Sequence, residues 1–249
     1  MTDRDTAKRT VDQLLSAFSL LTRLPLPQPA TFRGGEAAWL WPLVGLAVGA
    51  LMAAGAWLAL WLGLPAGVAG AVALAVAALA TGALHEDGLA DTADGLFGGW
   101  TKERRLEIMK DSRIGSYGVL ALMVVTLARW SAITALVAGG HWAAILAAAG
   151  LSRAPMAAVM AGLPNARGNG LSASTGAPTR GAAAGAAGLA LLLALLLTGG
   201  TAIAMGLAVL ATTAGVAALA KRKIGGQTGD ILGATQQMAE TAALAVAAG

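Results

Sequence analysis

The residues best suited to carry out chemistry lie in an acidic segment in the first half of the chain, HEDGLADTADGLFGG. Asp87, Asp91 and Asp94 follow one another at i, i+4 and i+7, so on a helix they would lie within about 60° of one another. Carboxylates on one face repel each other, and no Lys or Arg is interleaved with these three. Mg²⁺ would remove this repulsion, because it prefers oxygen ligands and usually shares them with substrate phosphates. The spacing therefore predicts that the three aspartates bind Mg²⁺; a merely solvated acidic loop is the alternative.

A second polar segment, RRLEIMKDSRIGSYG, brings cations close to these carboxylates. Lys110 and Arg113 flank Asp111, and cations beside a carboxylate cluster suit a substrate that carries phosphates and is bound with a metal. Charged side chains that only extend to the membrane surface where a helix enters the bilayer would give the same pattern. His85, which adjoins the acidic segment, is either a base or a structural hydrogen-bonding group.

A third polar segment, KRKIGGQTGDILGATQQMAE, places a glycine-rich run before an apolar helix. Free backbone N–H groups at such a helix start attract anions, so Thr228 and Asp230 are candidate phosphate-binding residues. No Gly-Lys-Ser/Thr follows, so this is not a nucleotide-binding P-loop. A plain helix cap explains Asp230 about as well. The two residues gain weight only because they are expected on the same side of the membrane as the aspartates.

Two arginines fall inside apolar segments. Arg129 and Arg153 lie near the middle of predicted membrane spans, where an arginine costs about 2.5–3.5 kcal/mol on insertion scales. Each therefore needs a partner in the bundle interior, and either Glu240 or an anionic substrate could supply it. Arg153 is accordingly a candidate phosphate-binding residue.

The elements that must position these residues are membrane helices. Of 249 residues, 57% are hydrophobic and 12% charged, whereas a soluble domain carries about 25% charged residues. The chain has no cysteine, which excludes disulfides, thiolate metal sites and a cysteine nucleophile. We predict an all-α, polytopic membrane protein that forms a single integral membrane domain over residues 1–249, with an N-terminal amphipathic helix. Six apolar runs are long enough to span a bilayer, and a weaker seventh follows: 40–63, 66–84, 117–138, 142–163, 181–198, 201–220 and 234–248.

The positive charges predict how these spans are oriented. Fifteen of the 17 Lys and Arg residues lie in the N-terminal interfacial segment 1–36 and in three polar loops, 85–116, 164–180 and 221–233. If the spans alternate, all four segments face one side, which the positive-inside rule makes cytoplasmic. No basic face is interleaved with aromatic residues, so a nucleic-acid partner is not expected. Four tryptophans near the ends of the first span are predicted to form interfacial belts: Trp39, Trp41, Trp57 and Trp61.

On these motifs the sequence resembles the cobalamin synthase family, the adenosylcobinamide-GDP ribazoletransferases. The resemblance rests on the acidic segment with its Lys-Asp-Ser-Arg continuation and on GGQTGDILGA, and it extends over LLTRLPLP, LSRAP and LPNARGNGL. It implies a Mg²⁺-dependent enzyme of the bacterial inner membrane. In that reaction α-ribazole, or its 5′-phosphate, attacks the cobinamide-linked phosphate of adenosylcobinamide-GDP. GMP leaves, and adenosylcobalamin, or its 5′-phosphate, is formed.

The resemblance also implies roles for particular residues. Asp87, Asp91 and Asp94 would bind the metal and diphosphate, with Asp111 and the two cations beside it assisting. One departure concerns the last helix, where Gln236 and Gln237 stand in place of an expected acidic residue, leaving Glu240. The residues alone leave open whether an aspartate of the triad or His85 accepts the proton, and we favour an aspartate.

Two other classes of function remain as alternatives. A small transporter would use Arg129, Arg153 and Glu240 along an ion path. Its two halves should then show a sequence repeat, and no such repeat is evident. An assembly subunit for a soluble enzyme complex is the other alternative. The Ala- and Gly-rich helices permit close packing and therefore a homo-oligomer, without requiring one.

Overall fold

A computed structural model describes residues 3–249, and within that range the regular secondary structure consists of helices joined by turns and loops, with an isolated bridge between Asn165 and Gln227. This agrees with the predicted all-α fold class. The elements are α1 (Asp3–Leu21), a 3₁₀ helix η1 (Gly35–Leu40), α2 (Trp41–Trp61), α3 (Ala66–Thr81), α4 (Leu84–Gly98), α5 (Lys102–Ile108), α6 (Ser116–Ala138), α7 (Trp142–Leu151), α8 (Ala154–Gly162), α9 (Leu171–Thr175), α10 (Arg180–Thr198), α11 (Thr201–Ile224) and α12 (Gly229–Ala248).

Five helical segments are long and apolar enough to cross a membrane, and a sixth is added if α3 and α4 form one bent span. The predicted polytopic membrane protein is therefore confirmed. The proposed seventh span, 234–248, lies in α12, which is a helix but is not among these segments. Its residues are mostly buried among other helices, which explains why it carries more polar side chains than a lipid-facing helix can.

The polar segment 85–116, predicted as a loop, is largely helical. The chain turns through 91° between α3 and α4 at Gly82 and Ala83, both in the left-handed backbone region. It then forms α4 and α5 before α6 begins. The segment 221–233 is also shorter as a loop than predicted, because α11 continues to Ile224 and α12 begins at Gly229.

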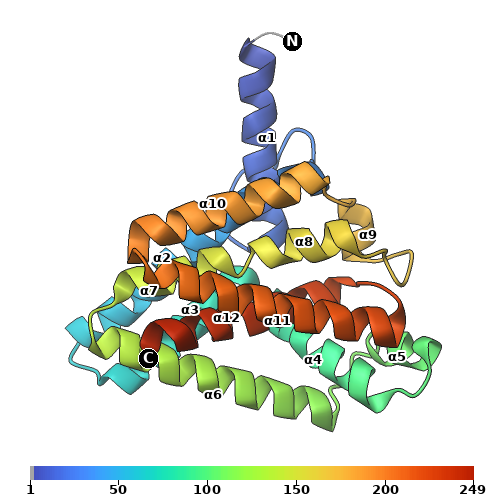
Figure 1. The fold of residues 1–249 in the computed structure, drawn as a ribbon. Helices are drawn as coiled ribbons and strands as arrows, with labels where there is room; N and C mark the ends of the chain where they lie inside the picture. The colour runs from blue at the N-terminus through green and yellow to red at the C-terminus, as the bar shows by residue number, and fades with distance from the viewer. Residues whose placement is uncertain (1–2) are drawn as a thin grey trace.

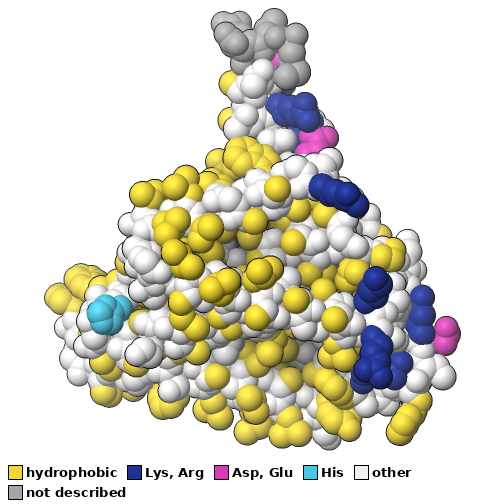
Figure 2. All heavy atoms as spheres, in the orientation of Figure 1, with side chains coloured by type: hydrophobic (Ala, Val, Ile, Leu, Met, Phe, Trp, Pro, Cys, Tyr) yellow, Lys and Arg dark blue, Asp and Glu magenta, His cyan; other side chains and the backbone are white. Residues whose placement is uncertain are grey.

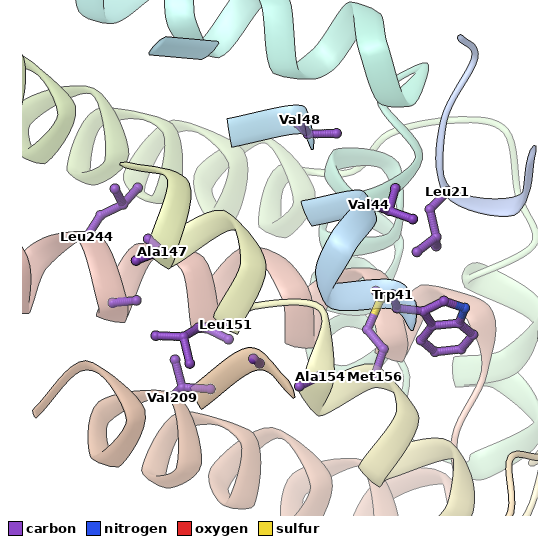
Figure 3. Packing of buried hydrophobic residues seen from close by; sticks show 14 of the residues in the cluster. Leu21, Trp41, Val44, Val48, Ala147, Leu151, Ala154, Met156, Val209 and Leu244 are labelled. Carbon is purple, nitrogen blue, oxygen red and sulfur yellow. The ribbon is translucent and has the colours of Figure 1, made fainter. Parts of the chain in front are cut away.

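Small residues allow the central helices to pack closely. A Cβ atom on Gly49 of α2 would lie 2.8 Å from the Cα of Leu146 in α7, so only glycine permits this approach. Figure 3 shows the core around these helices, with Val44 and Leu151 among its side chains. Trp41 belongs to this core and is only 2% exposed, so its predicted place in an interfacial belt is wrong.

The two ends of the bundle differ in charge. In Figure 1 the long helices α6, α10 and α11 run across the view, with α4, α5 and α9 at one end. In the same view, Figure 2 shows Lys and Arg side chains gathered at that end, while hydrophobic side chains cover much of the rest. Helix α1 projects away from the bundle (Figure 1), and two apolar residues of this predicted amphipathic helix, Val11 and Leu14, are exposed.

Candidate active site

The candidate active site forms where α4 crosses α12 at the charged end of the bundle. Gly88 and Gly233 make this crossing possible, because a Cβ on Gly88 would lie 2.9 Å from the carbonyl oxygen of Asp230 and 3.2 Å from the Cα of Gly233. The close approach brings the aspartates of α4 next to the first turn of α12. The carboxylates of Asp230 and Asp87 are both near enough to repel that of Asp91. Two acidic segments far apart in the sequence therefore form one cluster.

A pocket on the side of α5, which we call the outer pocket, unites five of the predicted site residues. Its lining includes Asp87, Asp91, Lys110, Asp111 and Arg113. The first two come from α4 and the other three from the connection between α5 and α6. A pocket with carboxylates on one wall and cations on the other can hold a phosphate group together with a metal ion.

Asp111 and Arg113 are paired with each other inside this pocket. The Nη2 atom of Arg113 lies 2.7 Å from Oδ2 of Asp111. The hydrogen bond from Arg113 lowers the pKa of the Asp111 carboxyl to about 2. Asp111 therefore stays ionised at neutral pH and is a poor proton acceptor, so its predicted assisting role is better described as holding Arg113 in place.

Asp94 differs from the other two aspartates of the predicted triad in its hydrogen-bond partners. Its Oδ2 accepts a hydrogen bond from the backbone N–H of Gly115 at 2.7 Å, and its Oδ1 accepts one from that of Gly118 at 2.9 Å. These donors are the free N–H groups at the start of α6, which a buried carboxylate stabilises. Asp94 therefore fastens α6 to α4, and a metal site built from the nearby carboxylates depends on Asp87 and Asp91.

A second hollow, which we call the inner cavity, meets the outer pocket at Asp87. Asp87, His85, Arg167 and Asp230 are among the residues that line it. Arg167 contributes a guanidinium 2.6 Å from the carboxylate of Asp230. Burial raises the pKa of the Asp230 carboxyl, and the charge of Arg167 opposes that shift.

Arg167 is the site residue that the sequence reasoning missed, since it was counted only among the charges that set orientation. Its position depends on the bridge between the loops at 164–166 and 225–228. The N–H of Gln227 donates to the carbonyl of Pro164, and the N–H of Ala166 donates to the carbonyl of Gln227, each at 2.8 Å. Pairing between such distant loops leaves no local signal in the sequence.

Thr228 acts as the N-cap of α12. Its hydroxyl oxygen accepts a hydrogen bond from the N–H of Ile231 and donates one to the Asp230 carboxylate at 3.2 Å. Thr228 is also 99% buried, being only 1% exposed. The cap of α12 is therefore Thr228 and not Asp230, for which a helix cap was the alternative. The phosphate-binding role of Thr228 remains a prediction without a free hydroxyl to support it.

Beneath the site, the two intramembrane arginines share one carboxylate. Arg129 and Arg153 lie 2.6 Å and 2.7 Å from the two oxygens of Glu240. Four further side chains extend this buried network through hydrogen bonds: Glu86, Ser152, Gln236 and Gln237. Of the two partners considered for Arg153, the structure selects Glu240. Arg153 is thus held inside the bundle and lines neither pocket, and the charges that a transporter would use along a path are paired with one another.

The donor set determines which metal could bind. Among residues 3–249 no group of three or more His, Asp or Glu side chains lies close enough to hold a metal ion. The carboxylates nearest one another at the site, Asp87, Asp91 and Asp230, offer only oxygen atoms, the ligands that Mg²⁺ prefers. Mg²⁺ also keeps several water and phosphate ligands, so two or three carboxylates at the edge of a pocket suit it.

The fold and site together define a polytopic helical membrane protein with a carboxylate- and cation-lined pocket at one end of its bundle. Residues 13–248 match the model of the cobalamin-5-phosphate synthase family, and the chain belongs to that family. A Bradyrhizobium diazoefficiens protein named adenosylcobinamide-GDP ribazoletransferase is 46% identical, over 98% of this chain and 96% of its own length. A Mesorhizobium japonicum protein of the same name is 44% identical, over 96% of this chain and 94% of its own. No solved structure matches the chain.

Proposed function

We propose that this protein joins α-ribazole, or its 5′-phosphate, to adenosylcobinamide-GDP and releases GMP. A ribose hydroxyl of the ribazole forms a bond to the cobinamide-linked phosphorus. The bond from that phosphorus to the oxygen of the GMP phosphate breaks, and the hydroxyl proton passes to the protein and then to water. The observation that carries this proposal is the outer pocket, in which Asp87 and Asp91 face Lys110 and Arg113 across a space suited to a diphosphate. The family and the names of the relatives agree with it.

We further propose that the site uses Mg²⁺ held by Asp87, Asp91 and Asp230 jointly with phosphate oxygens of the substrate, because the three carboxylates are not close enough together to hold a metal ion by themselves. Once bound, Mg²⁺ would neutralise charge on the diphosphate as GMP leaves. Asp230 replaces Asp94 in this set, because both Asp94 oxygens already bond to the start of α6. A carboxylate cannot itself attract a phosphate, so Asp230 is better explained as a metal ligand than as a phosphate-binding residue.

The remaining residues of the site hold the substrates and move the proton. Lys110 and Arg113 are positioned to bind the nonreacting phosphate oxygens. Asp91 is our choice for the proton acceptor, because it lines the outer pocket, where the attacking hydroxyl and the donor diphosphate would meet. Holding two large substrates in line would supply much of the rate enhancement. We place this end of the bundle at the cytoplasmic face of the bacterial inner membrane, where its Lys and Arg side chains satisfy the positive-inside rule.

The first test measures GMP release by the purified protein in lipid nanodiscs. Adenosylcobinamide-GDP and α-ribazole are supplied together or singly, with Mg²⁺ or with excess chelator. We expect GMP only when both substrates and Mg²⁺ are present. GMP release that is unaffected by chelator would contradict the metal assignment, and no release by folded protein would contradict the proposed reaction.

The second test replaces Asp91 with asparagine. Loss of the carboxylate should lower kcat by about 100-fold or more, because general base and metal-binding roles are both removed. Glu107→Gln is the matched control, since Glu107 is an exposed acid of the same segment that pairs only with Arg104 at 2.7 Å. Membrane insertion should be equal in both variants. Wild-type turnover by Asp91→Asn would remove Asp91 from the mechanism.

A further inference from the structure

The inner cavity has a composition that the transfer of phosphate does not require. Its polar end carries Asp87, Arg167 and Asp230, and most of the remaining surface is apolar, although four further polar residues also line it: His85, Asn169, Ser172 and Thr175. Leu21 comes from α1, Trp41 from the start of α2, and Met156 and Met160 from α8. Figure 3 shows Leu21 and Met156 on two sides of Trp41. Three separated parts of the chain therefore supply apolar side chains to a hollow that opens directly beside the carboxylates.

Four buried nitrogen atoms at this cavity have no hydrogen-bond partner in the structure: Nε1 of Trp41, Nε2 of His85, and Nε and Nη2 of Arg167. The Nη2 atom of Arg167 is ion-paired with Asp230, whereas Trp41 and His85 are at most 2% exposed and have no such pair. An unpaired buried polar group costs free energy, so it indicates a missing partner. Indole Nε1–H can only donate, which means that its partner must be an acceptor. A ligand for this cavity should therefore be mainly apolar and carry at least one acceptor atom.

The size and the polarity of the cavity together decide which part of the two substrates it can bind. Its volume is about 140 Å³, close to that of an apolar cavity of about 150 Å³ that holds benzene. A corrin macrocycle is far too large. The guanine of the donor carries donors and acceptors on most of its edges, so a base with fewer polar atoms suits the leucine and methionine side chains of this cavity better. The benzimidazole base of ribazole is flat and apolar, and its free ring nitrogen is a single acceptor.

We infer that the inner cavity binds the benzimidazole base of the ribazole and thereby selects the acceptor substrate. This inference rests on the proposed function. The methylated ring would lie among Leu21, Met156 and Met160, with Nε1–H of Trp41 donating to the ring nitrogen. The attached ribose would then extend to Asp87, which lines both hollows. Its hydroxyl would face the outer pocket, where the donor diphosphate binds.

The first test of this inference uses a substitution that adds a bulky side chain at the edge of the cavity. Leu171 lines the cavity from α9 and is 50% exposed, so Leu171→Trp adds bulk at little risk to folding. Leu120→Trp is the matched control, because Leu120 is 58% exposed on α6 and lines neither hollow. We expect Leu171→Trp to raise the KM for α-ribazole by about tenfold or more, the effect of a small misfit in an apolar pocket. The KM for adenosylcobinamide-GDP should stay within about twofold, on the same reasoning.

A second variant removes the donor and keeps the aromatic bulk. Trp41→Phe should weaken α-ribazole binding by about fivefold to tenfold, the value of one hydrogen bond. Trp57→Phe is its control, since Trp57 lies in the same helix and is 56% exposed. If either cavity variant instead raised the KM for adenosylcobinamide-GDP, the cavity would hold part of the donor, and the inference would be wrong.

Direct binding separates this inference from the proposed function. Radiolabelled α-ribazole is titrated against wild-type protein in nanodiscs without the second substrate. Binding that is weakened by Leu171→Trp but not by Leu120→Trp supports the inference even if no GMP is released. Equal binding by both variants, or no binding by the wild type, overturns it even if GMP release is observed.

Discussion

Glu240 is the residue on which the buried charges of this bundle depend. It is 1% exposed, and its two oxygens lie 2.6 Å and 2.7 Å from Arg129 and Arg153. Glu86 adds a second carboxylate 3.3 Å from Arg129, so two cations and two anions balance inside the protein. Because Glu86 directly precedes Asp87, the same network also fixes the part of α4 that carries the site.

Replacing Glu240 with glutamine should therefore destabilise the protein. The amide keeps the shape of the side chain but leaves two buried guanidinium groups with a single carboxylate between them. Breaking a buried ion pair in this way costs about 3–5 kcal/mol. The free energy of unfolding, measured by denaturant titration in detergent micelles, checks this value.

The control for this substitution is Glu36→Gln. Glu36 also pairs with two arginines, Arg9 and Arg33, but its side chain is 51% exposed. Exposed pairs contribute less than about 1 kcal/mol, so this variant should unfold almost as the wild type does. Equal stability of Glu240→Gln and Glu36→Gln would mean that the buried network contributes nothing to the fold.

The sequence predicted the need for this network but not all of its members. Mid-span arginines must have partners, and Glu240 was one of two candidates for that role. Glu86 and Gln237 could not be assigned, because their contacts with Arg129 require α4, α6 and α12 to meet. The same reason explains Arg167, which approaches Asp230 only through pairing between two distant loops.

At the level of elements, the crossing of α4 and α12 creates the site. The i, i+4, i+7 spacing predicted that three aspartates would share one face if their segment were helical, and α4 carries all three although the segment was predicted as a loop. The spacing could not show that Asp94 bonds to the start of α6 or that Asp230 joins the others. Helix partners depend on close approach at Gly88 and Gly233, and a single glycine in a helix does not reveal which helix it meets.

This crossing predicts a strong effect for Gly88→Ala. The added methyl group would lie 2.9 Å from the Asp230 carbonyl oxygen, so the two helices must separate. A displacement of about 1 Å at a reacting site can reduce the rate about 100-fold. We expect kcat for GMP release to fall by about tenfold or more on this basis, measured in nanodiscs with both substrates saturating.

Gly98→Ala is the matched control for this variant. Gly98 lies in the same helix, and a Cβ there would meet only the end of Ile108 at an ordinary 3.8 Å. Its activity should remain near that of the wild type. Full activity of Gly88→Ala would show that the helices tolerate separation and that the contact between α4 and α12 does not position the carboxylates.

For the molecule as a whole, composition and charge predicted more than local motifs did. Apolar runs located the candidate spans, and short turns at 63–65, 139–140 and 199–200 separate consecutive helices. The predicted place of Trp41 in an interfacial belt was wrong because hydropathy cannot distinguish a tryptophan at the membrane surface from one inside the bundle. Helices α4 and α5 were taken for a loop because their polar composition hides helices that pack on other protein segments.

The orientation of the bundle gives the last prediction, which cysteine labelling can test because the native chain has no cysteine. Thr101, Asn169 and Arg222 are exposed positions in three segments at the charged end, and each accepts a cysteine without requiring a left-handed backbone. In intact cells, a membrane-impermeant maleimide should leave all three unlabelled, and lysis should make them reactive. Leu62→Cys is the control at the other end of the bundle, because Leu62 is 62% exposed, and it should be labelled from outside.

If Thr101→Cys were labelled in intact cells, the carboxylates would face away from the cytoplasm that supplies the GDP-bearing substrate. The proposed reaction could not then proceed at that site.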